Sequence, residues 1–253
     1  MRYCILASGS KGNSIFVESG HARYLVDVGL SARKIEERLA TRNIDPATIS
    51  GIVLTHAHGD HVKGVGVFAH RHKLPIWGHP DTLDEITPYL KPGPNVKPWT
   101  GNFRTEDLSW TPFEVPHDSE PTHGYLISDG RSTLAICTDL GHYTERIREH
   151  LLQANAILLE SNHDPEMLMS GPYPWHLKDR ISGRRGHLSN YDAGELLRSI
   201  LNTRLRRVTL GHLSDQNNTR DKALNTVLEH VGPRGEAFIG VIEQQTVSEM
   251  YVL

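Results

Sequence analysis

The sequence predicts an α/β chain of the α+β kind, in which a β-sandwich carries helices on its outside. Two observations support this prediction. Short apolar strands are followed by amphipathic helices in both halves of the chain, and polar side chains follow the ends of several buried strands. No linker, repeat or low-complexity tract divides the 253 residues, so we expect a single domain over residues 1–253.

The first half of the chain opens with three predicted strands, at residues 2–6, 14–18 and 24–27, joined at first by a small-residue turn. Ser31 is a good N-cap, and the spacing of Ile35 and Leu39 predicts a helix that reaches Thr41. The remaining elements expected in this half are a strand at 51–54, a helix at 62–70, a strand at 74–77 and a helix at 81–90.

The second half starts with a segment rich in Pro and Gly, residues 92–112, which favours loops or short antiparallel strands. A strand from Phe113 is expected to end at His117, and the Asp129-Gly130 pair predicts a hairpin between strands 122–128 and 133–138. The other expected elements are helices at 144–153, 190–201 and 219–231, and strands at 156–159, 207–210, 236–242 and 246–252.

Composition excludes several classes of protein. The net charge of -3 and the pI near 6.6 argue against a globally basic nucleic-acid coat but leave room for a local basic patch. No stretch approaches the roughly 20 apolar residues of a membrane span, and two distant cysteines give no disulfide framework, so we expect a cytoplasmic protein. Histidine, at 16 residues, is the unusual feature.

The most informative segment is 54–61, Leu-Thr-His-Ala-His-Gly-Asp-His, between a buried strand and a predicted helix. His56, His58, Asp60 and His61 offer the nitrogen and oxygen donors that zinc, manganese or iron accept. A turn can aim the first two donors to one side and the last two to the other, which fits two metals better than one. We expect Gly59 to permit a tight backbone and Asp60 to act as both a ligand and the N-cap of the helix.

Further donors follow other strands: His117, Asp139, Glu160 and His212. Because strand ends of a layered fold meet at one edge, these residues are expected to converge with segment 54–61. Asp27 either orients a metal-binding histidine or simply ends its strand. The turn at residues 8–13 is either a plain hairpin loop or a loop whose backbone amides and Lys11 face a phosphate, and Cys137 is expected to pack in the core.

At this point the chain resembles the metallo-β-lactamase fold over nearly its whole length. The resemblance rests on the H-x-H-x-D-H pattern at 56–61, the lone His117, Thr138-Asp139 and the Gly-His-Leu-Ser at 211–214. It implies a four-layer αββα sandwich and a dinuclear site. One metal would be held by His56, His58, His117 and Asp139, and the other by Asp60, His61, His212 and the shared Asp139.

More narrowly, segments 7–13, 160–164, 173–175 and 186–190 are similar to those of the YycJ/WalJ group of this fold. Members of that group are regarded as 5'-to-3' exonucleases on double-stranded DNA. The resemblance implies two divalent ions (zinc or manganese, with iron as a further option), a metal-activated hydroxide that attacks phosphorus, and a DNA substrate. From the residues themselves, Asp60 is expected to orient the nucleophile, and His187, oriented by Glu160, to protonate the leaving oxygen. The Glu160 and His187 pair is similar to the Glu and His that nuclease members of this superfamily place beside the metals.

Substrate contacts are also expected from the resemblance. The candidates are Lys11, Ser189, Asn190, Arg180, Arg184 and Arg185, with Trp175 or Tyr173 stacking on a terminal base. For each arginine, a solvated surface loop is the alternative. The sequence does not assign an oligomeric state, and we expect no membrane partner.

Three other functions stay open on the residues alone. Because fold does not choose the substrate, the site also suits a small-molecule hydrolase such as a cyclic phosphodiesterase, lactonase or thioesterase. A non-catalytic DNA-repair or signalling protein could keep the fold without using a full donor set. An iron-bound oxidoreductase lacks support, since no flavin or nicotinamide motif accompanies the donors.

Overall fold

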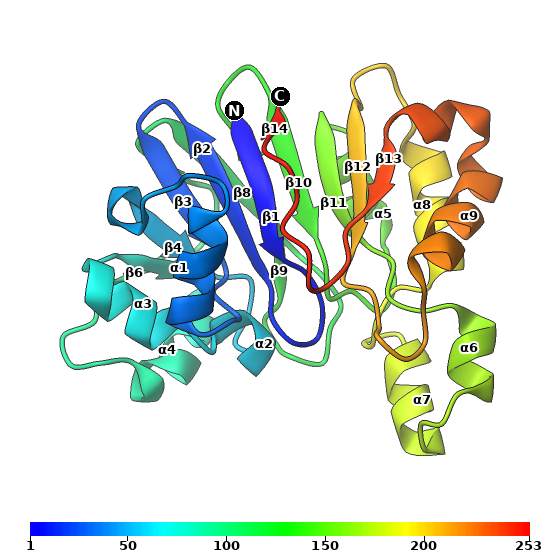
Figure 1. Cartoon of the computed structure of the whole chain (residues 1–253), viewed down its shortest axis with the longest axis horizontal. Helices are drawn as coiled ribbons and strands as arrows, with labels where there is room; N and C mark the ends of the chain where they lie inside the picture. The colour runs from blue at the N-terminus through cyan, green and yellow to red at the C-terminus, as the bar shows by residue number, and fades with distance from the viewer.

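The computed structural model describes residues 1–253 and contains two seven-stranded sheets (Figure 1). The first sheet consists, in spatial order, of β14 (Tyr251–Val252), β1 (Arg2–Ala7), β2 (Ser14–Ser19), β3 (Ala22–Val26), β4 (Gly51–Val53), β5 (Ile76–Gly78) and β6 (Val96–Pro98). Its strands are antiparallel from β14 to β3 and parallel from β3 to β6.

The second sheet consists of β13 (Ile239–Val241), β12 (Arg207–Gly211), β11 (Ala156–Glu160), β10 (Thr133–Cys137), β9 (His123–Ser128), β8 (Leu108–Glu114) and β7 (Phe103–Thr105). Strands β10 to β13 are parallel, and β7 to β10 are antiparallel. Each sheet therefore has a parallel half, whose loops at the carboxyl ends of the strands lie at one edge.

Helices cover the outer face of each sheet (Figure 1). The helices are α1 (Ala32–Ala40), α2 (Gly59–Val62), α3 (Val65–His72), α4 (Pro80–Ile86), α5 (Glu145–Leu151), α6 (Pro165–Ser170), α7 (Trp175–Ser182), α8 (Asn190–Ile200) and α9 (Arg220–Val231), with 3₁₀ turns η1 (Pro46–Thr48), η2 (Thr87–Tyr89) and η3 (Pro233–Ala237). None of the helices combines the length and the apolar character needed to cross a bilayer. Helices α6 and α7 project from the body below the second sheet (Figure 1).

Three apolar clusters hold the layers together. The cluster between the sheets includes Tyr3, Trp110 and Tyr125. A second cluster packs the first sheet against its helices and includes Phe68, and a third packs the second sheet against its helices and includes Leu196. The layers are thus helix, sheet, sheet, helix, which confirms the αββα sandwich.

Local signals placed most elements correctly. Ser31 and Thr219 cap α1 and α9, because each side chain accepts a bond from a backbone amide in the first turn of its helix. The hairpin of β9 and β10 turns through Asp129-Gly130, where Gly130 has the positive φ that this turn requires.

The predicted strand ending at His117 is wrong, because β8 runs from Leu108 to Glu114 and stops before it. Pro112, the last residue of the segment expected to form loops or short antiparallel strands, lies inside this strand. The missing amide is tolerated because β7 pairs only with residues 108–110, so β8 has one neighbour at Pro112. His117 therefore lies in the loop that follows the strand.

Other boundaries also differ from the prediction. The helix expected at 62–70 is interrupted between α2 and α3, where the Gly64 amide donates to the Val28 carbonyl oxygen at 2.8 Å. A Cβ at Gly64 would lie 2.1 Å from the Leu30 carbonyl oxygen, so this close approach requires glycine. The strand expected from residue 236 begins at Ile239, after η3, and the strand expected at 246–252 spans only Tyr251–Val252. The helices α6 and α7 were not predicted, because prolines and glycines separate them.

The start of α2 is fixed by two loops, the one between β1 and β2 and the one after β3. Asn13 donates its amide to the Asp60 carbonyl oxygen at 2.8 Å, and Val28 donates to that of His61 at 2.9 Å. A Cβ at Gly29 would lie 1.7 Å from the Asp60 carbonyl oxygen, so only glycine permits this approach. In contrast, Gly59 has open space around it and no positive φ, so the expected tight turn at Gly59 is wrong.

We predict that Gly29→Ala lowers the free energy of unfolding by about 1–3 kcal/mol, the usual cost of forcing an extra methyl into a packed site. It should also displace Asp60. Chemical denaturation and elemental analysis of the purified variant test both effects. Gly59→Ala is the matched control, and equal behaviour of the two variants would contradict the prediction.

Candidate metal centre

Side chains from both sheets meet at one edge of the sandwich. Asp27 follows β3, segment 55–61 follows β4, Asp139 follows β10, Glu160 ends β11 and His212 follows β12. His117 reaches the same place from the loop after β8. The convergence expected from the sequence is therefore present in the structure, and the site lies where the carboxyl ends of parallel strands from both sheets come together.

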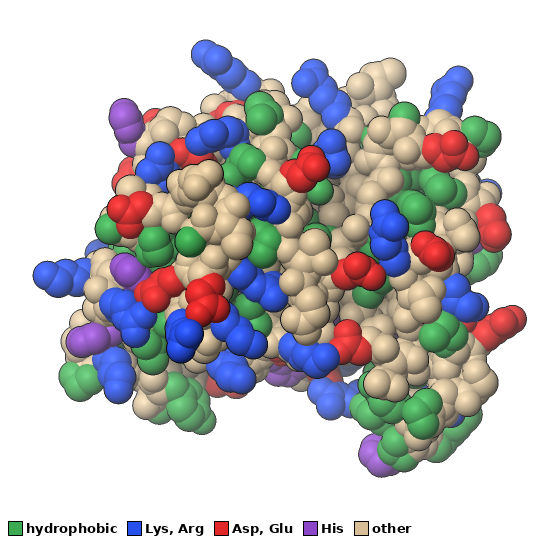
Figure 2. Space-filling model, in the orientation of Figure 1, with side chains coloured by type: hydrophobic (Ala, Val, Ile, Leu, Met, Phe, Trp, Pro, Cys, Tyr) green, Lys and Arg blue, Asp and Glu red, His purple; other side chains and the backbone are tan.

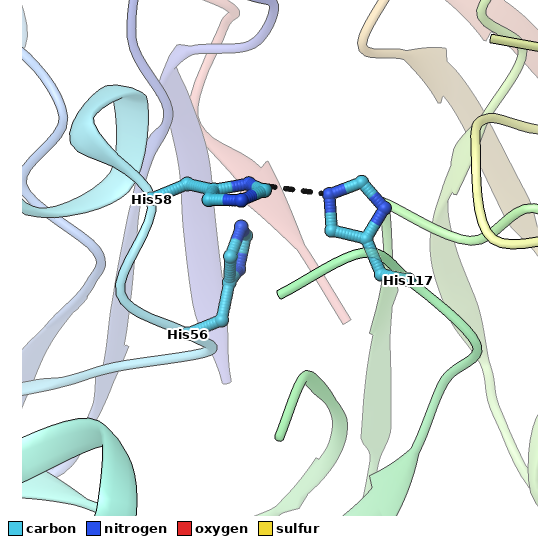
Figure 3. Close-up of side chains that lie close together, drawn as sticks. All are labelled: His56, His58 and His117. Atoms are coloured by element: carbon cyan, nitrogen blue, oxygen red, sulfur yellow. Dashed lines mark hydrogen bonds between the residues drawn. The ribbon is translucent and has the colours of Figure 1, made fainter. Parts of the chain in front are cut away.

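Three histidines form one side of the site. Figure 3 shows His56, His58 and His117 pointing toward one another, the first two from the loop after β4 and the third from the second sheet. His58 Nδ1 lies 3.3 Å from His117 Nε2, and one nitrogen of each ring lies within 4.8 Å of the others. This spacing suits three ligands of a single ion.

Asp60, His61 and His212 form the other side, and one donor atom of each lies within 4.8 Å of the others. The Asp60 Oδ2 atom is 3.6 Å from His61 Nε2 and 3.8 Å from His212 Nε2. Asp60 lies in the first turn of α2, whose N-cap is His58, so its expected role as N-cap is wrong.

Asp139 lies between the two groups. Its Oδ2 is 3.2 Å from His61 Nε2, whereas its Oδ1 is 3.4 Å from His212 Nε2 and 3.9 Å from His117 Nε2. One carboxylate thus reaches histidines of both groups. This is the position that a carboxylate shared by two ions must occupy.

Three residues of the site have a left-handed backbone: Asp27 at φ 60°, Asp139 at 59° and His212 at 55°. Each follows the end of a strand. Non-glycine residues adopt this conformation at a cost and cluster at functional sites. The left-handed turn redirects the chain immediately after each strand, at the point where the side chain meets the centre.

Two buried carboxylates orient the histidines from behind. Asp27 Oδ2 accepts from His61 Nδ1 at 2.8 Å and from the Thr55 hydroxyl at 2.8 Å. Glu160 Oε1 accepts from Nδ1 of both His212, at 2.7 Å, and His187, at 2.8 Å. Of the two roles considered for Asp27, the structure shows the orienting one, and such partners fix which ring nitrogen faces a metal.

The site carries more negative charge than its own cations balance. Four carboxylates, those of Asp27, Asp60, Asp139 and Glu160, gather here, and no Lys or Arg nitrogen lies within 4 Å of any of them. The cluster therefore calls for added positive charge.

The pKa values follow from this balance. Burial disfavours charged His61 and His212, yet Asp139 and the other carboxylates raise the pKa of both well above the ordinary value. Burial also opposes ionised Glu160, but the imidazoles of His187 and His212 lower the pKa of its carboxyl to about 2. Burial lowers the pKa of His56 well below its usual range, which keeps this ring neutral and able to bind a metal.

Three buried donor atoms at the centre, His56 Nε2, His212 Nε2 and Asp139 Oδ2, make no hydrogen bond. Buried polar atoms without partners are rare and costly. Because these atoms belong to both groups of donors and to the carboxylate between them, the residues fit two divalent cations. The chemistry of the donors, imidazole and carboxylate, suits the same ions.

Of the two interpretations of the turn at residues 8–13, the structure favours the plain hairpin loop, because three of its backbone amides already have partners within the protein. The amides of Gly9, Lys11 and Gly12 donate to the Asn13 side chain, the Gln244 side chain and the Gly9 carbonyl. The Lys11 ammonium is exposed and pairs with Asp215.

The segment at residues 171–190, which is rich in basic and aromatic side chains, lies beside the centre. Its arginines already contact other side chains of the protein. Arg180 binds Asp118 at 2.6 Å, Arg185 binds Glu120 at 2.5 Å, and Arg184 lies against His142. Trp175, at the start of α7, is 63% exposed, which leaves its ring free to contact a partner. Tyr173, Arg180 and His187 line a cavity of about 190 Å³ between α7 and the centre.

Ser189 and Asn190 are not available to substrate, which corrects the prediction for both. Ser189 is the N-cap of α8 and bonds Asp192. Asn190 is fully buried and bonds the side chains of Ser161 and Asn218. Both side chains instead anchor the chain that follows His187.

Sequence reasoning missed two polar residues of the site. Asn13 places its amide 2.9 Å from His61 Nε2 and 3.2 Å from Asp60 Oδ2. Asp118 places a carboxylate oxygen 3.3 Å from His117 Nε2. Its position directly after His117 was the available signal, and for Asn13 the signal was its place in the 8–13 turn, to which no role at the metal centre was assigned. Cys137 is buried, as expected, in the apolar cluster between the second sheet and its helices, and burial raises the pKa of its thiol.

Comparison with known proteins places these features in context. Residues 22–213 match the beta-lactamase superfamily domain. The chain is 36% identical over 246 residues to a protein of Streptococcus pneumoniae named exodeoxyribonuclease WalJ, covering 95% of this chain and 90% of that protein. It is 34% identical over 246 residues to one of Bacillus anthracis named exodeoxyribonuclease YycJ, covering 94% and 93%.

Solved structures share the fold at low identity. The metallo-beta-lactamase fold protein YhfI from Bacillus subtilis aligns with a TM-score of 0.75 and 15% identity over 98% of each chain. Zn²⁺-bound PqqB from Methylobacterium extorquens aligns with a TM-score of 0.71 and 18% identity, covering 98% of this chain and 100% of that one. These two likenesses concern the fold alone.

We predict that Asp60→Asn lowers the metal content of the purified protein from two ions per chain toward one. The amide keeps the shape of the carboxylate but removes the charge that one group of donors contributes. Elemental analysis measures the change. Asp81→Asn, an exposed carboxylate of α4, is the control and should keep two ions. Two ions in Asp60→Asn would contradict the division of donors into two groups.

Proposed function

This chain belongs to the beta-lactamase superfamily and, within it, to the family of the WalJ and YycJ exodeoxyribonucleases. We propose that it is itself a metal-dependent exodeoxyribonuclease. The relatives support this proposal because the chain aligns with 90% or more of their length. The observation that carries it is the donor set with His187 joined to it through Glu160. A purely structural role requires no such set.

The proposed ligands are His56, His58 and His117 for one ion and Asp60, His61 and His212 for the other, with Asp139 shared. Bound ions supply charge neutralisation at the phosphodiester and activate water for attack at phosphorus. We propose zinc or manganese, since the donors serve both. We propose that a phosphodiester is held against this edge of the sandwich.

His187 is the proposed general acid. Its Nδ1 is held by Glu160, and its Nε2 makes no hydrogen bond within the protein and borders the cavity beside α7. Burial opposes the charged ring, but the Glu160 carboxylate raises the pKa of His187 above its ordinary value. The Glu160 carboxylate therefore favours the protonated ring, and we propose that Nε2 delivers the proton to the departing oxygen.

Asp60 is proposed to orient the attacking water, since its carboxylate is partly exposed at the mouth of the site. Double-stranded DNA and 5'-to-3' polarity are the proposed substrate and direction. The two cysteines are buried and form no disulfide, which supports a reducing compartment and hence the cytoplasm as the proposed location.

We predict that the protein loaded with Mn²⁺ or Zn²⁺ releases nucleotides from linear duplex DNA, and that His58→Ala abolishes the release because it removes a ligand. Duplexes labelled at the 5' or the 3' end, resolved on one gel, report activity and polarity together. If both proteins leave the duplex intact while the wild type hydrolyses bis(p-nitrophenyl) phosphate, the enzyme is a small-molecule hydrolase and the nuclease proposal fails.

We predict that His187→Ala lowers kcat on DNA by about 10²–10⁴-fold, the usual contribution of a general acid. Metal content should stay at two ions per chain, because His187 belongs to neither group of three donors. Single-turnover digestion and elemental analysis measure the two effects. Glu160→Gln should lower both rate and metal affinity, the latter about 10–100-fold, because Glu160 also orients His212. Loss of metal from His187→Ala would contradict the assigned role.

A further inference from the structure

A groove of about 630 Å³ opens beside Asp60, between α1, the start of α2 and the loop at residues 8–13. Four cationic side chains line it: Lys11, Lys34, Arg38 and Lys63. The only carboxylate in its lining is that of Asp60, one of the proposed metal ligands. In Figure 2, Lys and Arg side chains gather over this part of the molecule, on a protein whose net charge is -3.

The charge in this groove is mostly unneutralised. No carboxylate lies within 4 Å of the ammonium of Lys34 or Lys63, and both side chains are exposed. The Arg38 guanidinium donates only to the carbonyl oxygens of Leu6 and Gln245. Like charges held together without counterions repel one another, so such a surface gains free energy by binding an anion.

The arrangement of α1 explains why the cations stay free. The acidic residues of this helix are paired away from the groove, Glu36 with Arg71 at 2.8 Å and Glu37 with Arg33 at 2.8 Å. Lys34 and Arg38 are four residues apart, which places them on one side of the helix. That side is the wall of the groove.

The opposite flank of the centre differs in this respect. There two of the three arginines expected to bind phosphate have acidic partners, since Arg180 pairs with Asp118 and Arg185 with Glu120, whereas Arg184 lies against His142. The groove beside α1 is lined by three cations without a carboxylate partner, so more of the unneutralised positive charge lies on that flank. The two flanks are continuous, because Ser10 lines both this groove and the cavity that His187 borders.

We propose that the groove binds the phosphate backbone of the DNA substrate on the α1 side of the metal centre, opposite the His187 cavity. Lys34 and Lys63 are its main contacts. This inference rests on the proposed exodeoxyribonuclease function. A strand that passes from the His187 cavity past Ser10 would cross the metal centre and continue over α1. Contacts of this kind bind every sequence alike and weaken with salt, because each neutralised phosphate releases counterions.

The test is the affinity of Lys34→Ala/Lys63→Ala for a fluorescein-labelled duplex with phosphorothioate linkages at its ends, which slow digestion. Anisotropy at a series of KCl concentrations gives the dissociation constant and its salt dependence. We expect weaker binding at low salt and a plot of log K against log[salt] that is shallower by about 1.8, since each phosphate contact contributes about 0.9. Arg38 is left intact because it also ties α1 to neighbouring loops.

The matched control is Lys91→Ala/Lys97→Ala, which removes the same charge from exposed positions at the β6 edge of the first sheet. It should keep the wild-type slope. The groove proposal is overturned if the Lys34/Lys63 variant keeps the wild-type affinity and slope, or if both variants lose affinity equally. Wild-type protein that digests no DNA would instead overturn the proposed function, so the two failures are distinguishable.

Discussion

The structure depends on the concentration of buried negative charge at the edge where the two sheets meet. Asp27, Asp60, Asp139 and Glu160 converge there, and the only basic side chains within 4 Å of their carboxylates are histidines. Bringing four carboxylates together is unfavourable unless positive charge is added. The left-handed turns after three strands and the close approach at Gly29 hold the donors in place against that repulsion.

Much of this centre could be predicted because most of its donors follow closely after an apolar strand. Strand ends are visible in the sequence as a change from apolar to polar residues, and His56, Asp139 and His212 all occur at such changes. His117 was placed correctly near the site although its strand was wrong. The shift in β8 did not matter, since the loop after it still reaches the same edge.

The remainder depended on contacts between distant segments, which no local pattern reports. No local pattern indicated that Arg180 faces Asp118, that Asn190 is fully buried, or that amides of the 8–13 loop already have partners. Each of these facts comes from which loops oppose one another after folding. For the same reason, the basic run before His187 drew attention to α7, while the free lysines were dispersed between α1 and α2.

The double use of Glu160 couples the two histidines that it holds. One oxygen, Oε1, holds both His212 and His187, so the proton on either ring alters the field felt by the other. The relative position of the two rings is therefore set by a single oxygen atom. A movement of Glu160 would displace a proposed metal ligand and the proposed acid together.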